Sequence, residues 1–277
     1  MPELPEVETV RRSLLPHLVG QTIEDVEIGL QRIIKYPHPD QFVASIRGRQ
    51  FLAIERRGKY LLFRLTGDYT LVIHLRMTGQ LRLAPSTQPL PKYTHVLFQL
   101  RGGDQLRFSD MRQFGAMYLA PDHDIARVAN MEKLGWEPLE HFPVEEFAGL
   151  LSSRRTKIKN LLLNQCVIAG VGNIYADESL FLAGIHPETP AHELSFEQVQ
   201  RLHDCLIRVL QAGVAMRGTT FSDYVDGLGE SGSFQHQLTV YGREGQPCPK
   251  CGQPIQRTKL AGRSAHFCAQ CQRCPRP

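Results

Sequence analysis

The first six residues, MPELPE, combine a proline with acidic side chains at the very start of the chain. Removal of Met1 would leave Pro2 with a terminal secondary amine, and an α-amino group has a reference pKa of about 8, compared with about 10.4 for lysine. Such an amine can attack a sugar aldehyde carbon and form an iminium, while Glu3 and Glu6 move protons. The alternative is an ordinary helix start, in which the acids serve the helix dipole.

Four cysteines near the carboxyl end have the spacing of a structural zinc site. Cys248 and Cys251 form one C-x2-C pair, and Cys268 and Cys271 form a second pair after 16 intervening residues. Four thiolates satisfy tetrahedral Zn²⁺, and the bound metal replaces the hydrophobic core that so short a segment lacks. Disulfides are the alternative, as is a ligand set that uses Cys274, which we otherwise expect to be a spare thiol.

Positive charge is concentrated in the same tail. The segment 243–277 holds seven basic residues and one acid, although the whole chain has a net charge of only +4. This asymmetry predicts a polyanionic partner, with a solubilising tail as the alternative. An Ala-Gly-Arg turn between the cysteine pairs would present Arg263, whose guanidinium can clamp a phosphate.

The stretch NQCVIAGVGNIYADE contains two glycines, Gly170 and Gly172, but it is not a dinucleotide-binding loop. A helix precedes it, and Tyr175 stands where the third glycine would be. The pattern predicts a helix, a tight turn and a second helix capped by Asn173. The free backbone amides at the start of this second helix could bind an anion. Lys157 and Lys159 flank that site, with solvated lysines as the alternative. Two more cysteines, at 166 and 205, are expected in the core.

Composition and periodicity predict an α+β protein with more than one domain. The 277 residues are 42% apolar and 22% charged, with no apolar run long enough to span a membrane, and we expect a cytosolic protein. Apolar periodicity predicts helices at 5–18, 143–152, 156–164, 173–183 and 195–216. Short β-branched and apolar runs between residues 22 and 120 predict a β-sandwich or barrel. These runs are TIEDVEIGL, QFLAIERRG, YLLFRL, YTLVIHL, THVLFQL, QLRFSD and GAMYLA. Residues 217–237 read as a long mobile loop.

Six separated motifs together resemble the bacterial formamidopyrimidine-DNA glycosylase family. They are MPELPEVETVRR, RRGKYL, HLRMTG, DMRQFG, NQCVIAGVGNIYADE and the four-cysteine tail. The resemblance covers essentially the whole chain. It implies a bifunctional glycosylase and abasic-site lyase with an N-terminal helix and β-sandwich, a helix-two-turn-helix domain and a zinc-finger hairpin. The corresponding domain boundaries are 1–121, a linker at 122–142, 143–240 and 241–277.

The same resemblance implies roles for the residues of the first motifs. Pro2 would attack C1′ of the damaged nucleotide and hold the sugar as an imine during β,δ-elimination. Glu3 resembles the proton donor for sugar opening, Glu6 its supporting acid, and Lys59 the lysine near the lesion. The cofactor would be one structural Zn²⁺, held by Cys248, Cys251, Cys268 and Cys271.

The resemblance also implies how the DNA is held. An extruded base leaves a gap in the duplex. Met77, Arg112 and Phe114 resemble the residues that fill this gap, with Arg112 facing the orphaned cytosine; core packing is the alternative for Met77 and Phe114. The implied phosphate contacts come from both domains, which predicts a strongly bent duplex. They are Lys59, His74, Asn173, Tyr241 and Arg263, and Lys157 is a further candidate for DNA binding.

A loop over the extruded base is implied by Thr219, Thr220, Ser222 and Tyr224. Thr78 stands where some relatives carry Glu, so a direct base contact there is in doubt. The expected partner is double-stranded DNA with oxidised bases or abasic sites. We expect a monomer that does not bind membranes and that works in the bacterial cytoplasm at the nucleoid. The alternatives are an endonuclease VIII-like enzyme for oxidised pyrimidines and a binder of damaged DNA without catalysis.

Overall fold

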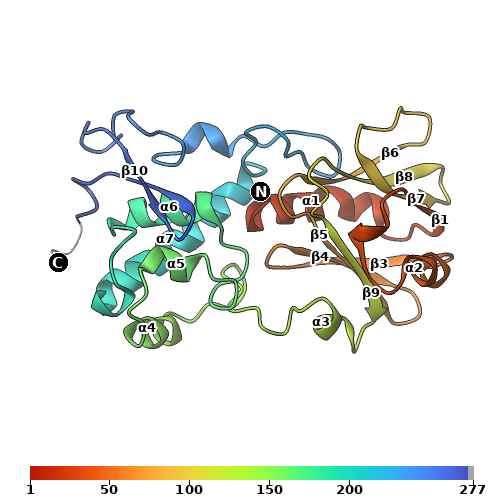
Figure 1. Cartoon of the computed structure of the whole chain (residues 1–277), viewed down its shortest axis with the longest axis horizontal. Helices are drawn as coiled ribbons and strands as arrows, with labels where there is room; N and C mark the ends of the chain where they lie inside the picture. Colours follow the sequence, from red (N-terminus) through yellow and green to blue (C-terminus); the bar gives the residue numbers. More distant parts are fainter. Residues whose placement is uncertain (274–277) are drawn as a thin grey trace. The chain divides into compact units, whose positions relative to one another are not determined.

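The computed structural model describes residues 1–273, and their contacts divide into two compact units (Figure 1). Unit 1 contains Met1–Lys133 together with Met216–Ser233. Unit 2 contains Leu134–Ala215 and the chain from Phe234 onward. The chain therefore leaves unit 1, builds most of unit 2, and returns to unit 1 for one loop.

Unit 1 begins with helix α1, Leu4–Leu18. Pro5 lies in its first turn, where a missing amide hydrogen costs nothing. Val7, Val10, Leu14 and Leu18 recur at helical spacing and are completely buried. Each contributes about 1.5–3 kcal/mol by leaving water. The burial of this face anchors the amino terminus, which would otherwise fray.

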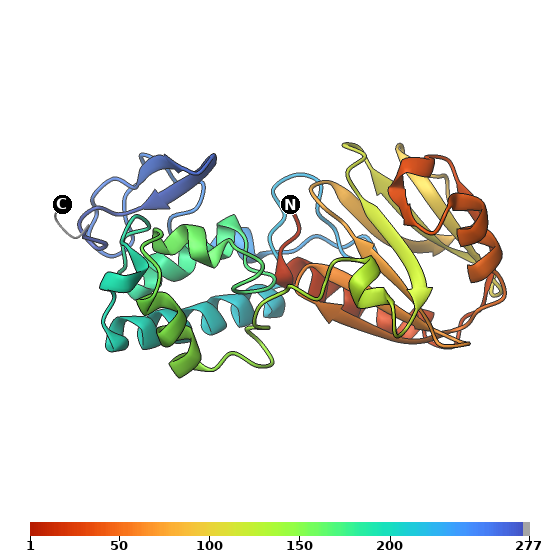
Figure 2. The ribbon, with the colours of Figure 1, turned by 60° about the horizontal axis from the view of Figure 1, so that its bottom comes forward.

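Two sheets form the body of unit 1. One has four strands in the order β1-β7-β8-β6, and the other has five in the order β2-β9-β5-β4-β3. Figure 2 shows these sheets beside α1, with β3–β5 in orange and β6–β8 in yellow. Side chains of both sheets and of α1 form one core cluster. The strands are β1 Ile23–Ile28, β2 Ile34–Tyr36, β3 Phe51–Arg57, β4 Tyr60–Leu65, β5 Tyr69–His74, β6 Gly79–Pro85, β7 Thr94–Leu100, β8 Asp104–Asp110 and β9 Ala116–Pro121.

The sequence prediction missed β6, β2 and the short helices of unit 1. Strand β6 reads as alternating polar and apolar residues, QLRLA, which is a strand pattern. These helices are α2 Pro39–Ile46, α3 Ile125–Val128 and the 3₁₀ turn η1 Gln31–Ile33. In α2, Pro39 at the start and the buried pair Phe42 and Ile46 are the signals that periodicity could have found.

Unit 2 is helical, and α6 is its central helix. Helix α6, Asn173–Ala183, is buried on nearly every side and ends at Gly184, whose φ of 71° needs glycine's freedom. Helices α5, Ile158–Leu162, and α7, Phe196–Ala215, pack against it, and α4, Val144–Ser152, packs against α7. The 3₁₀ turns of unit 2 are η2 Ala191–Glu193 and η3 Phe234–Gln237. The bounds agree with the predicted helices to within about two residues at each end.

The carboxyl end of unit 2 is a hairpin of β10, Gln256–Leu260, and β11, Arg263–Phe267. Ala261 and Gly262 have φ values of 46° and 80°, which suit a two-residue turn between twisted strands. The predicted α+β class, with a sandwich, a helical domain and this hairpin, is confirmed. Within residues 1–273, no helix combines the length and apolar character needed to cross a membrane.

Candidate nucleic-acid interface and metal centre

The amino terminus of unit 1 is held by an exchange of contacts between Glu3 and Glu6. Both side chains are 2% exposed, and Pro2 is buried as well. The Glu3 backbone N–H donates to Glu6 Oε2 at 2.8 Å, and the two residues form a capping box at the start of α1. Sequence reasoning placed these residues together, and the structure gives Glu6 a further partner.

That partner is the returning loop, residues 216–233. The Thr219 backbone N–H donates to Glu6 Oε1 at 2.8 Å. The Tyr224 hydroxyl donates to the Glu6 carbonyl at 3.2 Å, and burial together with the Glu6 charge raises the pKa of this tyrosine. A Cβ on Gly218 would lie 2.9 Å from Glu6 Oε1, so only glycine permits this approach. The carboxylate thus joins the amino terminus to the loop.

Further contacts within the loop fix its path, although it contains neither helix nor strand. Thr220 Oγ1 donates to the Tyr224 carbonyl at 3.0 Å and accepts from the Gly232 N–H at 2.9 Å. Ser222 is exposed and bonds only locally, to Asp223. The loop predicted from composition is therefore present, and its anchoring to α1 was not visible in the sequence.

Lys59 lies in the turn before β4, next to the residue of β4 that pairs with His74 at the end of β5. Gly58 and Lys59 connect β3 to β4, and Tyr60 pairs with His74 across β4 and β5. His74 Nδ1 accepts from the Arg76 backbone N–H at 2.9 Å. Burial, followed by the charges of Arg76 and Lys59, lowers the pKa of His74 to about 3. A neutral ring whose Nδ1 accepts a hydrogen bond carries its proton on Nε2.

Met77, Arg112 and Phe114 lie on two adjacent turns of unit 1. Arg112 Nη1 lies 2.9 Å from Met77 Sδ, and its guanidinium stands 4.9 Å from the centre of the Phe114 ring. Met77 and Phe114 are 41% and 53% exposed. The alternative that they pack in the core is therefore wrong, because the turns hold them in solvent.

Glu8 is a buried acid of α1 that the sequence analysis did not single out. It accepts hydrogen bonds from Arg11, Arg12 and Arg56, with 3.1 Å between Arg56 Nε and Glu8 Oε2. Burial acts to raise the pKa of Glu8, but the bonds from Arg11 and Arg12 lower it to about 2. Arg56 also donates to the Gly58 carbonyl at 3.2 Å. Glu8 thereby ties α1 to the turn that carries Lys59.

In unit 2, a buried ion pair attaches the hairpin to the helices. Lys159 Nζ lies 2.5 Å from Asp177 Oδ1, and both side chains are completely buried. Asp177 Oδ2 lies 3.0 Å from both the backbone N and the ring Nδ1 of His266 on β11. The expectation that Lys159 flanks an anion site is wrong, because its ammonium is buried against Asp177.

The next acid of α6, Glu178, holds the segment that leads into the hairpin. Its carboxylate accepts from the backbone N–H groups of Thr239, Val240 and Tyr241 at 2.8–3.0 Å. Sequence reasoning quoted Asp177 and Glu178 in a motif but missed these roles. Adjacent acids inside an otherwise apolar helix were the available signal, since buried carboxylates need donors.

The remaining predicted contact residues of unit 2 occupy different settings. The expectation that Asn173 caps α6 is wrong, because Gly172 is the N-cap residue and Asn173 is the first residue of the helix. Asn173 donates from Nδ2 to Ser264 Oγ at 3.2 Å, while its Oδ1 is buried without a hydrogen-bond partner. Arg263 is exposed at the hairpin tip. The ring of Tyr241 meets that of His266 edge on at 4.9 Å. Lys157 is half-exposed and pairs with Glu188.

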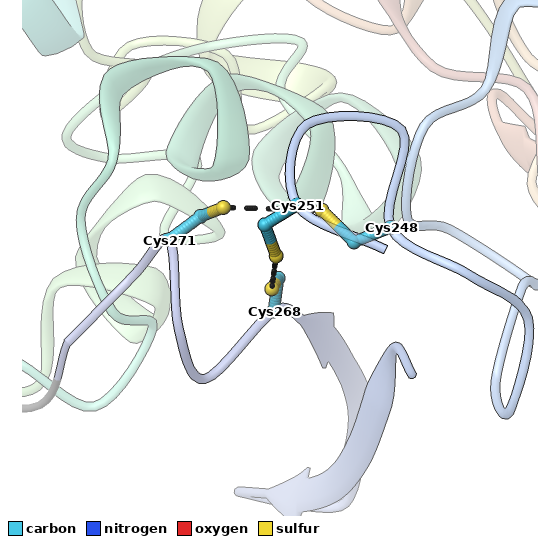
Figure 3. Close-up of side chains that lie close together, drawn as sticks. All are labelled: Cys248, Cys251, Cys268 and Cys271. Atoms are coloured by element: carbon cyan, nitrogen blue, oxygen red, sulfur yellow. Dashed lines mark hydrogen bonds between the residues drawn. The ribbon is translucent and has the colours of Figure 1, made fainter. Parts of the chain in front are cut away.

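The four predicted cysteines converge into one cluster (Figure 3). All four sulfur atoms lie within 4.8 Å of one another, with 3.9 Å between the sulfurs of Cys248 and Cys271 and 3.4 Å between those of Cys251 and Cys268. A tetrahedral zinc with 2.3 Å bonds separates its sulfurs by about 3.8 Å. The donor set and spacing therefore fit one structural Zn²⁺, as predicted, and the thiols form no disulfide.

The other cysteines differ from expectation. Cys166 is exposed, so its placement in the core is wrong, and Cys205 is half-buried. Cys166 lies in the turn after α5, where its backbone N–H bonds to the Asn164 side chain. An apolar neighbourhood in the sequence did not reveal this turn. Cys274 lies outside the described residues.

Sequence comparisons match this architecture part by part. Residues 1–117 match the formamidopyrimidine-DNA glycosylase N-terminal domain, 134–225 the H2TH domain of that enzyme, and 245–273 the zinc finger found in FPG and IleRS. A formamidopyrimidine-DNA glycosylase of Desulforamulus reducens is 52% identical over 275 residues, which are 99% of each chain.

Solved structures agree with this match. A complex of Lactococcus lactis Fpg with Fapy-dG-containing DNA has a TM-score of 0.91 at 39% identity, over 98% of this chain and 100% of the other. A complex of the wild-type L. lactis protein with DNA containing an oxidised pyrimidine has a TM-score of 0.92 at 40% identity, with the same coverage.

Fold and matched domains define the class as that of DNA glycosylases with an H2TH domain and a zinc finger. Within that class, the chain belongs to the formamidopyrimidine-DNA glycosylase family.

Proposed function

We propose that this chain is a bifunctional DNA glycosylase and abasic-site lyase that excises oxidised purines, 8-oxoguanine and formamidopyrimidines, from duplex DNA. The observation that supports it most directly is the Glu6 carboxylate, which accepts from Glu3 at the amino terminus and from Thr219 in the returning loop. The group that would do the chemistry and the segment that would cover the damaged base are thus held by one side chain.

In this proposal the mature terminus supplies the nucleophile. After loss of Met1, the Pro2 nitrogen attacks C1′ of the damaged nucleotide, and the bond from C1′ to the base breaks. The base leaves with the electron pair of that bond, and the proton lost by the Pro2 nitrogen neutralises it. Glu3 gives a proton to the ring oxygen as the sugar opens, which leaves an iminium between Pro2 and C1′. Loss of a proton from C2′ then expels the 3′ phosphate, a second elimination expels the 5′ phosphate, and water releases the sugar remnant.

The DNA contacts are proposed on the same basis. Met77, Arg112 and Phe114 would fill the gap left by the extruded nucleotide, with Arg112 facing the acceptors of the unpaired cytosine. Thr219, Thr220, Ser222 and Tyr224 would surround the damaged base.

Phosphates would be bound by donors from both units. Lys59 and the Nε2–H of His74 serve from unit 1, and Arg263 from unit 2. Asn173 suits such a role, because reversing its amide lets Oδ1 accept from Ser264 and leaves an N–H donor. Lys157 and Tyr241 complete the proposed set. The zinc supplies folding energy to the hairpin that carries Arg263.

The decisive experiment is borohydride trapping on duplex DNA with 8-oxoguanine opposite cytosine. Borohydride reduces an iminium to a stable amine, so a covalent complex is expected from the processed protein. A Pro2→Gly variant that still binds the duplex should give much less of it, because its terminal amine is primary and lacks the proline ring. Failure of the processed protein to give a trapped complex would favour a non-catalytic binder of damaged DNA.

In bacteria we expect the monomer to work in the cytoplasm at the nucleoid.

Substrate class needs a separate measurement, because an L. lactis relative has been crystallised with an oxidised pyrimidine. We expect faster excision of 8-oxoguanine and formamidopyrimidines than of thymine glycol at equal enzyme concentration. Faster excision of thymine glycol would assign the chain to the endonuclease VIII type of activity.

A further inference from the structure

Asp110 is a buried carboxylate to which neither the fold nor the proposed chemistry has given a role. It is 1% exposed and is the last residue of β8. In the sheet it pairs with Gly79, the first residue of β6. The turn that carries Met77, which precedes β6, therefore lies beside the turn that carries Arg112 and Phe114, which follows β8.

The carboxylate accepts hydrogen bonds from both turns. From the Met77 turn, Thr78 Oγ1 donates to Asp110 Oδ1 at 2.5 Å. From the other turn, the Arg112 N–H lies 3.2 Å from Oδ1, and the Gly115 N–H donates to Oδ2 at 2.7 Å. The Arg112 N–H also lies 3.1 Å from Thr78 Oγ1. One side chain thus links two turns that are about 35 residues apart in sequence.

Glycines make each turn tight enough for these bonds. A Cβ on Gly79 would lie 2.3 Å from the Leu75 carbonyl oxygen. A Cβ on Gly115 would lie 2.3 Å from the Phe108 ring and 3.3 Å from Asp110 Oδ2. At these two glycines the backbone comes closer to its neighbours than any other residue would allow. The glycines shape each turn, and the carboxylate holds the two turns relative to each other.

We propose that Asp110, together with the Thr78 hydroxyl, is a positioning residue that sets Met77, Arg112 and Phe114 as one rigid group for insertion into the duplex. This inference rests on the proposed function. Burial of a carboxylate costs free energy unless donors compensate it, and here all the donors come from the two turns. In return for this cost, the carboxylate keeps the two turns in fixed positions. Side chains that fill a gap in a duplex must be held to within a fraction of an ångström.

Asp110→Asn and Thr78→Val test this role. An amide cannot accept at both of its ends, so Asp110→Asn leaves a donor facing a donor; valine keeps the shape of threonine without its hydroxyl. Thr78→Ser restores the hydroxyl. Ser109→Ala is the matched control, because Ser109 is buried on the same strand and bonds to the Thr94 side chain at 3.0 Å, away from the turns.

Two substrates separate positioning from general damage to the fold. A duplex with 8-oxoguanine opposite cytosine must be opened and its gap filled, whereas a single-stranded oligonucleotide with an abasic site has no gap. We expect Asp110→Asn and Thr78→Val to lower kcat/KM on the duplex by roughly 10- to 100-fold and on the single strand by less than about threefold. Thr78→Ser and Ser109→Ala should stay within about threefold of the unsubstituted protein on both substrates.

A second readout follows insertion directly. With 2-aminopurine beside the orphaned cytosine, unstacking raises the fluorescence, and the two disruptive variants should lose most of that rise. Equal losses on both substrates, or full activity and fluorescence, would overturn the inference. If Asp110→Asn does not fold, the same outcomes for Thr78→Val decide. If the unsubstituted protein cleaves only the single strand, the proposed excision activity fails instead, and the fluorescence change still tests Asp110.

Discussion

The Glu6 carboxylate accepts a hydrogen bond from the Thr219 backbone N–H at 2.8 Å, across 213 positions of sequence. Its other oxygen accepts from the Glu3 N–H at 2.8 Å. A single buried acid therefore fixes both the start of α1 and the loop of residues 216–233.

Glu6→Gln is expected to impair base excision more than strand cleavage at an abasic site. A glutamine has one acceptor oxygen, so it cannot serve both N–H groups, and the loop acts only on a base that an abasic site lacks. Excision of 8-oxoguanine should fall by about 100-fold, the loss typical of small misplacements. Single-turnover assays on the two substrates measure the difference; equal losses would refute it. Tyr224→Phe keeps the carboxylate contacts and should cost about fivefold or less.

Glu8 is expected to make the fold sensitive to acid. Its pKa falls from 4.5 to about 2 in the folded chain. The ionised form thus stabilises the protein fully above about pH 5, and this stability is lost as the pH falls towards 2. Glu8→Gln should lower the free energy of unfolding at pH 7 by roughly 3 kcal/mol, with the difference shrinking in acid.

Urea unfolding from pH 7 to pH 3 measures this difference. Glu55→Gln is the control, because Glu55 is half-exposed and its bond to Arg64 should be worth less than about 1 kcal/mol. A Glu8 variant whose deficit is the same at every pH would contradict the assignment.

His74 is expected to stay neutral between pH 5 and 8. Burial and the charges of Arg76 and Lys59 lower its pKa to about 3, so the proton on Nε2 remains available to a phosphate throughout this range. Nitrogen-15 chemical shifts of the ring should show the Nε2–H tautomer and no titration. A midpoint between pH 5 and 8 would show that the ring is more solvated than its burial indicates.

Zinc removal is expected to abolish DNA binding while the sheets of unit 1 remain folded. The cluster of Cys248, Cys251, Cys268 and Cys271 organises a hairpin with little core of its own, so metal binding is folding energy there. Elemental analysis should find about one zinc per chain. Cys268→Ser should lose the metal, whereas Cys166→Ser, which alters an exposed thiol outside the cluster, should retain it. Full DNA affinity after chelation would refute the role.

Arg263→Ala is expected to weaken binding to all duplexes alike and to reduce the salt dependence. Loss of one phosphate contact should lower the slope of log K against log salt by about 1. Arg263→Lys should keep the slope but lose affinity, because an ammonium lacks the guanidinium fork. Fluorescence anisotropy at several salt concentrations measures both quantities. A loss confined to lesion-containing DNA would show that Arg263 reads the lesion and not the backbone.

Local sequence signals predicted the elements and the metal ligands well. Helix α6 begins at Asn173 and α1 ends at Leu18 as expected, because apolar periodicity acts within a few residues of chain. The zinc cysteines were predictable for the same reason, since two C-x2-C turns are short-range geometry. The prediction missed strand β6, although its polar and apolar residues alternate in the sequence.

Only the tertiary structure decided which polar groups meet. In the folded chain Lys159 is buried against Asp177, the Thr219 N–H donates to Glu6, and Thr78 donates to Asp110 across the sheet. No local rule fixes such partners, because a carboxylate in a helix or at a strand end is equally compatible with solvent. The choice is made by folding, when burial removes water and each charged or polar group must find its donor or acceptor among side chains far away in sequence.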